Sequence, residues 1–257
     1  MSARRLEGLG VVITRPKSAA DVLARALERE GARAFVFPAL EIEACDPTPV
    51  QRAALQELGG FGLAIFISAN AVERGLALAR SAAPWPAHTR VAAVGEATAQ
   101  ALRNSGFATV ISPKERHDSE ALLALPELRS VKGENIVVFR GEGGREHLRD
   151  VLEDRGARVD YVECYRRSRP RTDPAPLLAA WARGDVHAVS ALSAETLENF
   201  LAMLGAEADA RIAGCALVVP HAAIAAHPDA RQFARVVVAA PGAEGLVSAL
   251  AGLRVTP

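Results

Sequence analysis

The sequence predicts an α/β fold with two doubly wound parallel-sheet lobes, related by an internal repeat and joined by a two-stranded linker. Two observations carry this prediction. Short apolar runs alternate with helical patterns along the chain, which is typical of parallel sheets covered by helices on both faces. The chain also repeats itself 125 residues further on, where Gly31 is matched by Gly156 and Ser68 by Ser193.

In the first half, each element follows from its own pattern. Residues 11–14 form an apolar run and predict a strand. Residues 19–30 predict a helix, because Val22, Leu23 and Leu27 share one face and Gly31 ends the pattern. Further strands are expected at 35–37, 64–68, 91–94 and 109–111, and further helices at 71–79 and 96–105.

The second half repeats this order, with strands expected at 136–139, 159–162, 188–192, 216–219 and 236–239 and helices at 146–154 and 194–204. Two extended segments, the proline-rich 38–49 and 163–170, occupy matching places in the repeat. If the chain crosses between the lobes at both of these segments, one lobe consists of residues 1–37 and 168–257 and the other of residues 42–164. The linker strands are then 38–41 and 165–167. A cleft between two lobes is a common place for a small molecule to bind.

The composition excludes several classes of protein. Lys plus Arg and Asp plus Glu are equal at 30 each among 257 residues, so no overall charge favours nucleic acid or a membrane surface. The three cysteines lie far apart in sequence, which argues against a disulfide framework and against a metal site. The apolar run near the N-terminus stops at Arg15, too early for a signal peptide. We therefore expect a soluble cytoplasmic protein that binds neither metal nor nucleic acid nor membrane.

Small or hydroxyl residues follow several strands directly, at the point where a helix begins. In open parallel sheets ligands bind outside the carboxyl ends of the strands, where the free N–H groups of the next helix attract anions. Ser68 and Ser193 are equally well explained as ordinary N-caps. The candidate anion-binding residues at these strand ends are Thr14, Arg15, Ser68, Ala69, Asn70, Thr98, Ser193 and Ala194.

Three further positions are candidates for the site. A glycine-rich turn follows the strand at 136–139, and Arg140 and Arg145 within it suit a carboxylate cradle, although a flexible solvated turn is an equal interpretation. It lacks the third glycine of a dinucleotide fingerprint and the lysine of a P-loop. His221 follows a strand end, and Tyr165 lies in the expected crossover, from which a phenol can reach a cleft.

In the order and spacing of its motifs the chain resembles the uroporphyrinogen-III synthase family over essentially its whole length. The motifs that carry the resemblance are 13–16, 31 with 37–42, 66–72, 94–102 with 106, 163–167, 192–194 and 240–250. The chain departs from the family at 219–223, which reads Val-Pro-His-Ala-Ala where the family often has a hydroxyl residue.

The resemblance implies a lyase without cofactor that closes hydroxymethylbilane to uroporphyrinogen III, with loss of water and inversion of ring D. It implies two α/β lobes on a two-stranded linker, and it points to Tyr165 as the acid that protonates the departing hydroxyl. A phenol is protonated at neutral pH and can donate. We expect a monomer whose partner is its small-molecule substrate, with transient contact to the preceding or following tetrapyrrole enzyme.

Two other functions fit the same sequence. One is a two-lobed cytoplasmic binding module for a small carboxylated ligand, without catalysis. The other is a catalytically dead pair of regulatory lobes attached to a tetrapyrrole enzyme. The absence of an export signal, together with a tyrosine in the linker, argues against the first of these. The lack of a further domain after Pro257 argues against the second.

Overall fold

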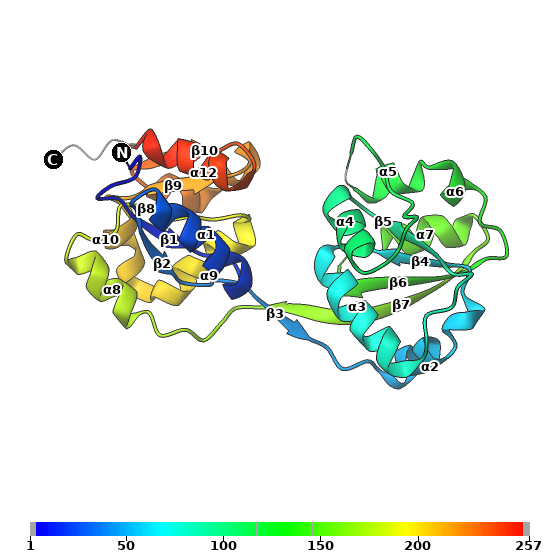
Figure 1. The fold of residues 1–257 in the computed structure, drawn as a ribbon. Helices are drawn as coiled ribbons and strands as arrows, with labels where there is room; N and C mark the ends of the chain where they lie inside the picture. Colours follow the sequence, from blue (N-terminus) through cyan, green and yellow to red (C-terminus); the bar gives the residue numbers. More distant parts are fainter. Residues whose placement is uncertain (1–3, 117, 145, 254–257) are drawn as a thin grey trace. The chain divides into compact units, whose positions relative to one another are not determined.

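A computed structural model describes residues 4–116, 118–144 and 146–253 (Figure 1). The fold is mixed α/β with two five-stranded sheets. The chain divides into two compact units, unit 1 with residues 1–41 and 168–257 and unit 2 with residues 42–167. Each sheet lies almost entirely within one unit, and each unit has its own hydrophobic core.

Unit 1 contains a fully parallel sheet in the order β10-β9-β8-β1-β2. The central strands are buried on both faces because their residues are apolar without alternation, as parallel sheets require. The strands are β1 (Gly10–Ile13), β2 (Arg33–Val36), β8 (Ala188–Ser190), β9 (Ala216–Val219) and β10 (Arg235–Val238).

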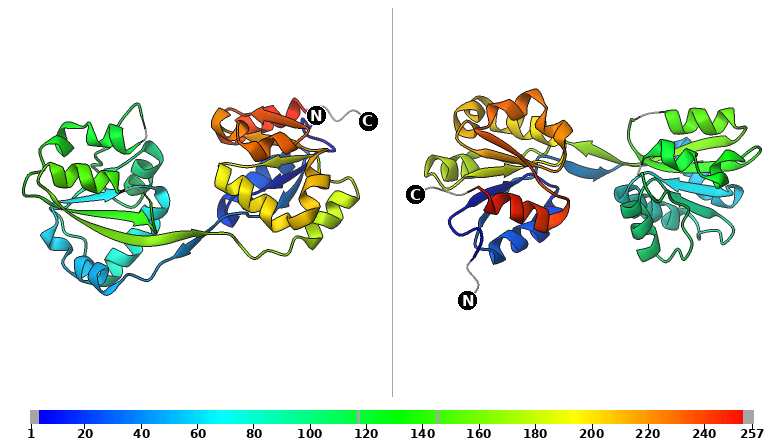
Figure 2. Two further views of the ribbon diagram at one scale, coloured as in Figure 1. Left: turned by 180° about the vertical axis from the view of Figure 1, so that it is seen from behind. Right: turned by 90° about the horizontal axis from the view of Figure 1, so that it is seen from above.

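Helices cover both faces of this sheet (Figure 2). On one face, Val12 and Leu217 pack with Trp181 and Phe200. On the other face, alternate strand residues pack with the apolar stripes of α1 and α12. The helices are α1 (Lys17–Arg29), α8 (Ala175–Ala182), α9 (Ala194–Leu204), α10 (Ala208–Ile212), α11 (Ala222–Ala225) and α12 (Gly242–Ala251), with 3₁₀ turns at Gly205–Glu207 and Pro228–Gln232.

Unit 2 contains a sheet in the order β3-β7-β6-β4-β5, in which β7, β6, β4 and β5 run parallel. Its strands are β3 (Glu41–Ala44), β4 (Leu63–Phe66), β5 (Arg90–Ala93), β6 (Asn135–Gly141) and β7 (Arg158–Ser168). Its helices are α2 (Pro49–Gln56), α3 (Ala69–Ala82), α4 (Glu96–Asn104), α5 (Ser119–Leu123), α6 (Pro126–Arg129) and α7 (His147–Asp154), with a 3₁₀ turn at Leu58–Gly60. As in unit 1, separate core clusters lie on its two faces.

Two expectations from the sequence need correction. The segment 109–111, expected as a strand, makes one isolated bridge in which both Ile111 backbone groups bond to β5. Pro113 follows shortly and lacks the N–H that a longer ladder needs. The segment up to Pro49 was expected to stay extended, but Pro49 begins α2, where Thr48 and Gln51 form a capping box. Proline is favoured at the first position of a helix because its missing N–H would be unpaired there.

No helix in the described part of the chain is long and apolar enough to cross a membrane.

Gly75 provides a test of how tightly α3 packs on β6. A Cβ at position 75 would lie 2.6 Å from Cδ1 of Phe139, a fully buried ring that stacks on Phe66. Helix propensity favours alanine over glycine by about 1 kcal/mol, but overpacking a core costs about 1–3 kcal/mol. We expect Gly75→Ala to lower the free energy of unfolding in urea by up to about 2 kcal/mol.

Gly214→Ala is the matched control, because a Cβ there meets no atom within 4 Å and the backbone φ is not positive. It should leave the unfolding free energy within about 0.5 kcal/mol of the parent. An unchanged or higher stability of Gly75→Ala would show that the helix can shift away from Phe139 at little cost.

Candidate functional site at the strand ends

The candidate residues gather at the carboxyl ends of neighbouring strands within each unit. In unit 1 the ends of adjacent strands β9, β8 and β1 carry His221, then Ser193 with Ala194, then Thr14 with Arg15. In unit 2 adjacent strands β7, β6, β4 and β5 form the second group. The residues of that group are Tyr165, Arg140, Ser68, Ala69, Asn70 and Thr98.

In unit 1 the hydroxyl groups of this edge make bonds within the protein. Thr14 is fully buried, and its Oγ1 donates to the carbonyl of Ser190 at 2.7 Å, which ties β1 to β8. Ser193 caps α9, since its Oγ accepts from the N–H of Thr196 at 3.1 Å and lies 2.8 Å from that residue's hydroxyl. His221 is exposed at the start of α11 and makes no side-chain cap bond.

Arg15 lies at the unit 1 edge without an ion-pair partner among the described residues. Its side chain is partly buried, and its Nε is fully buried without a hydrogen-bond partner in the described structure. Burial lowers the pKa of this guanidinium because the charged form is less well solvated there. Pro16 precedes α1, a 13-residue helix, and no side-chain cap bond is made at this start. A partly desolvated arginine beside the first amides of a helix suits an anionic ligand.

In unit 2, Ser68 and Tyr165 form a hydrogen-bonded pair. The two hydroxyl oxygens are 3.0 Å apart, and Ser68 Oγ also accepts from the N–H of Ala71 at 3.1 Å, which caps α3. Tyr165 is only 3 % exposed, whereas Ser68 is partly exposed. The pair joins the start of α3 to β7, although the two residues are 97 positions apart in sequence.

Gly141 makes room for the Tyr165 ring. The pairing of β6 with β7 shifts register between Arg140 and Gly141, so that Gly141 lies opposite Tyr165. A Cβ at position 141 would be 2.8 Å from two carbons of the ring. Sequence analysis missed this contact, because a glycine in a turn-like run gives no sign that it faces a ring on the next strand.

Arg140 is enclosed by the glycine-rich turn. It is 4 % exposed, and its guanidinium donates to the carbonyls of Gly141 and Gly143 and to the carboxylate of Glu146. Gly144 has φ +106°, and a Cβ there would be 2.6 Å from an Arg140 nitrogen. The side chain therefore holds the shape of the turn. Arg145, the other arginine of the expected cradle, lies outside the described residues.

A second arginine that the sequence did not single out lies beside this turn. Arg149 stacks on the ring of Tyr161, with 3.8 Å from its guanidinium carbon to the ring centroid, and Arg140 contacts the same ring at 4.5 Å. Burial is the main cause that raises the pKa of Tyr161, and the nearby carboxylate of Glu146 raises it further. The phenol is thereby kept neutral between two cations, and the stack fixes the start of α7.

The remaining residues of the unit 2 edge frame two helix starts. Thr98 is buried in the first turn of α4, and Gly95 precedes that helix without a side-chain cap. Ala69 is exposed and Asn70 is partly exposed at the start of α3. These helices present backbone N–H groups and the positive ends of their dipoles at the same edge as Ser68.

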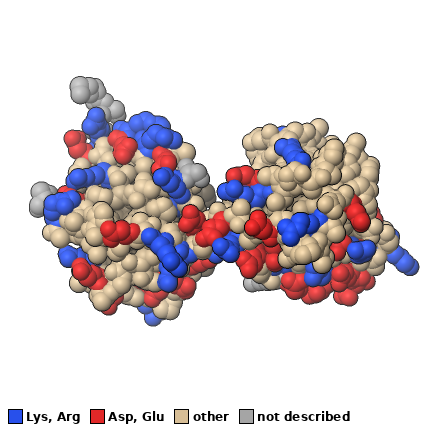
Figure 3. All heavy atoms as spheres, turned by 90° about the horizontal axis from the view of Figure 1, so that it is seen from below, with Lys and Arg blue, Asp and Glu red and all other residues tan. Residues whose placement is uncertain are grey.

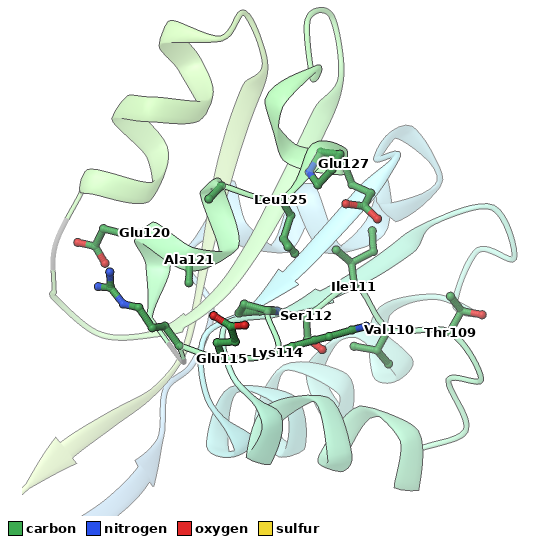
Figure 4. Close-up of a pocket in the computed structure, with 14 residues that line it drawn as sticks. Thr109, Val110, Ile111, Ser112, Lys114, Glu115, Glu120, Ala121, Leu125 and Glu127 are labelled. Carbon is green, nitrogen blue, oxygen red and sulfur yellow. The ribbon is translucent and has the colours of Figure 1, made fainter.

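A cavity of about 710 Å³ lies elsewhere in unit 2, between the segment 109–116 and the helices α5 and α6 (Figure 4). Ile111, Ala121 and Leu125 line it, with Glu120 and Glu127 also among its walls. None of the candidate residues lines this cavity. We therefore place the candidate site at the strand ends, where the polar groups converge, rather than at this cavity.

The charges of the described residues do not single out one partner class. Basic and acidic side chains are interspersed over both units on the face shown in Figure 3. Within the described ranges, no group of three or more His, Cys, Asp or Glu is arranged to hold a metal ion. Burial raises the pKa of the Cys164 thiol, near Arg140, to about 12, so this cysteine is neutral at physiological pH.

Comparison with known proteins identifies what the chain is similar to. The sequence profile described as "Uroporphyrinogen-III synthase HemD" matches residues 21–248. A uroporphyrinogen-III synthase of Salmonella typhimurium is 36 % identical over 74 % of this chain and 78 % of its own, and one of Escherichia coli is 32 % identical over 76 % and 80 %. The fold resembles the uroporphyrinogen-III synthetase of Helicobacter pylori, with a TM-score of 0.61 at 13 % identity over 96 % of this chain and 100 % of the other.

The isolation of Arg15 leads to a prediction about stability. A partly buried guanidinium without a partner adds little to folding, and replacing such a charge by an apolar side chain of similar length is neutral or stabilising. We expect Arg15→Met to unfold in urea at the same free energy as the parent, or at a higher one. Arg155→Met is the matched control, because Arg155 donates to the carbonyls of Leu123 and Leu128 at 2.8 Å each. It should cost about 2 kcal/mol. A comparable loss in Arg15→Met would contradict the view that its charge is held ready for a ligand.

Proposed function

The chain belongs to the uroporphyrinogen-III synthase family of cyclising lyases in haem biosynthesis, and from that premise we propose that the strand ends described above in each unit bind parts of its substrate. The observation that carries the proposal is the convergence of hydroxyl, amide and guanidinium groups at the carboxyl ends of both sheets. Such ends are the usual ligand sites of open parallel sheets.

The reaction closes hydroxymethylbilane to uroporphyrinogen III with loss of water and inversion of ring D. The departing hydroxyl needs one proton, and the cation that remains is reactive enough to attack without a further catalyst. The linear substrate can also close unaided to the other isomer. The main task of the protein is therefore to hold one conformation, so that one carbon is attacked rather than its neighbour.

Eight substrate carboxylates require many separate donors. In our proposal Arg15 and the first amides of α1 bind one group of carboxylates, together with Ser193, Ala194 and His221. Ala69, Asn70 and Thr98 provide amides and polar atoms at the starts of α3 and α4. Thr14 and Arg140 act indirectly, since their side chains are buried and bonded to strands or turn. Charge-assisted bonds of this kind are the strong ones.

We also propose that the two units are repeated lobes, 1–37 with 168–257 and 42–164, with linker strands 38–41 and 165–167. The strand orders support this, because strands related by the 125-residue repeat have the same neighbours. Thus β8 lies between β9 and β1 in unit 1, and β4 lies between β5 and β6 in unit 2. The enzyme would act as a monomer without cofactor, with transient contact to neighbouring tetrapyrrole enzymes.

The decisive experiment couples the purified protein to freshly made hydroxymethylbilane and separates isomers I and III of the product. Isomer III should dominate, whereas a parallel incubation without protein should give isomer I. Isomer I alone in both incubations would refute the activity. If a carboxylated ligand nonetheless bound, that result would favour a binding module without catalysis.

Tyr165 is the proposed source of the proton for the departing hydroxyl. A positioned proton donor contributes roughly 10²–10⁴-fold to a rate, so Tyr165→Phe should lower kcat within that range while product affinity and melting temperature stay close to the parent values. Tyr165→Ala should in addition destabilise the fold, because a ring that is 3 % exposed is removed. A fully active Phe variant, with an Ala variant that only loses stability, would restrict Tyr165 to packing.

A further inference from the structure

We infer that the proton supplied by Tyr165 reaches the substrate through the hydroxyl of Ser68. Ser68 is then the catalytic residue that touches the departing hydroxyl, and Tyr165 acts through it. This inference rests on the proposed function and concerns how its proton transfer is arranged. It follows from the burial of the two side chains, from their hydrogen bonds, and from the position of Ser68 at the start of α3.

Burial separates the roles of the two residues. The Tyr165 side chain is 3 % exposed, with its ring against Gly141 and its hydroxyl 3.0 Å from Ser68 Oγ. Ser68 is partly exposed, and it lies two residues after the end of β4, at the edge where ligands bind in such sheets. Of the two hydroxyl groups, the one belonging to Ser68 is therefore the group that a substrate can reach without repacking of the core.

The hydrogen bonds define the direction in which the protons point. A serine hydroxyl has one proton and two acceptor lone pairs. The N–H of Ala71 occupies one lone pair of Ser68. When the Tyr165 hydroxyl donates to the other, the proton of Ser68 has no further acceptor among the described residues and can be given to a bound group. A substrate hydroxyl in front of Ser68 is such a group.

The transfer balances in protons. Ser68 Oγ–H gives its proton to the departing hydroxyl, the carbon–oxygen bond breaks with its electron pair on oxygen, and water leaves. Tyr165 passes its proton to Ser68 Oγ in the same step and becomes a phenolate. Ring closure with inversion of ring D then forms two carbon–carbon bonds to that ring and breaks one, and the ring releases one proton. That proton returns through Ser68 to the phenolate, so the protein ends as it began.

The start of α3 favours this arrangement. Ser68 is the N-cap of a 14-residue helix, whose positive dipole end lies beside the two oxygens that carry transient negative charge. The equivalent Ser193 in unit 1 caps α9 in the same way, but its hydroxyl lies 2.8 Å from Thr196, a residue of its own helix. The structure therefore assigns the relay to Ser68 alone.

A double-mutant cycle tests the relay. Ser68→Ala and Tyr165→Phe should each lower kcat by about 10²-fold or more, with smaller changes in KM. The double variant should be no more than about threefold slower than the slower single variant, since both changes interrupt one path. Losses that multiply in the double variant would overturn the relay. A proton inventory in mixed H₂O and D₂O should bow downward in the parent, as expected for two protons in motion, whereas a linear plot would also overturn it.

Two further variants separate catalysis from capping. Ser68→Gly costs a cap only a few tenths of a kcal/mol, so it should fold and be as slow as Ser68→Ala, while Ser68→Thr, which keeps a hydroxyl, should restore most of the rate. Thr48→Ala removes the cap of α2 in the same unit and should lower the melting temperature without a change in kcat. Full activity of Ser68→Gly with a slow Tyr165→Phe would overturn the relay and leave Tyr165 as a direct donor. Full activity of Tyr165→Phe would overturn both.

Discussion

The candidate site depends on one constraint, the common direction of neighbouring strands. Every strand pair of the unit 1 sheet is parallel, and so are the pairs joining β7, β6, β4 and β5 in unit 2. Parallel strands end at the same edge of a sheet, so the helices that follow them begin side by side. Residues as distant in sequence as Ser68 and Tyr165 meet there for this reason, and backbone N–H groups accumulate at the same edge.

A second constraint is the space that glycine leaves at this edge. Gly141 lies against the ring of Tyr165 and Gly144 lies against the guanidinium of Arg140, so that neither position can carry a side chain without movement. The register shift between Arg140 and Gly141 brings Tyr165 over the first of these glycines. The same register shift therefore positions both the glycine-rich turn and the Tyr165 ring. A change in one is expected to displace the other.

The buried strands and the long helices could be predicted from sequence because apolar periodicity is a local property. Helix α2 was not predicted, since Pro49, with which it begins, is also compatible with an extended chain. The residue types of the site were predictable for the same local reason, as Ser68, Ser193 and Arg15 directly follow apolar runs. Their partners were not: the bond from Ser68 to Tyr165, the enclosure of Arg140 and the stack of Arg149 on Tyr161 depend on sheet order and register, which a single sequence does not specify.

The internal repeat clarifies why similar edges can carry different chemistry. Ser68 and Ser193 lie 125 positions apart and both cap a helix that follows a buried strand. At the same offset, Tyr165 corresponds to Leu40, which has no hydroxyl to offer Ser193. Ser193 instead bonds with Thr196 of its own helix. The two halves thus differ in the partner of the capping serine, whereas the caps that stabilise both helices remain the same.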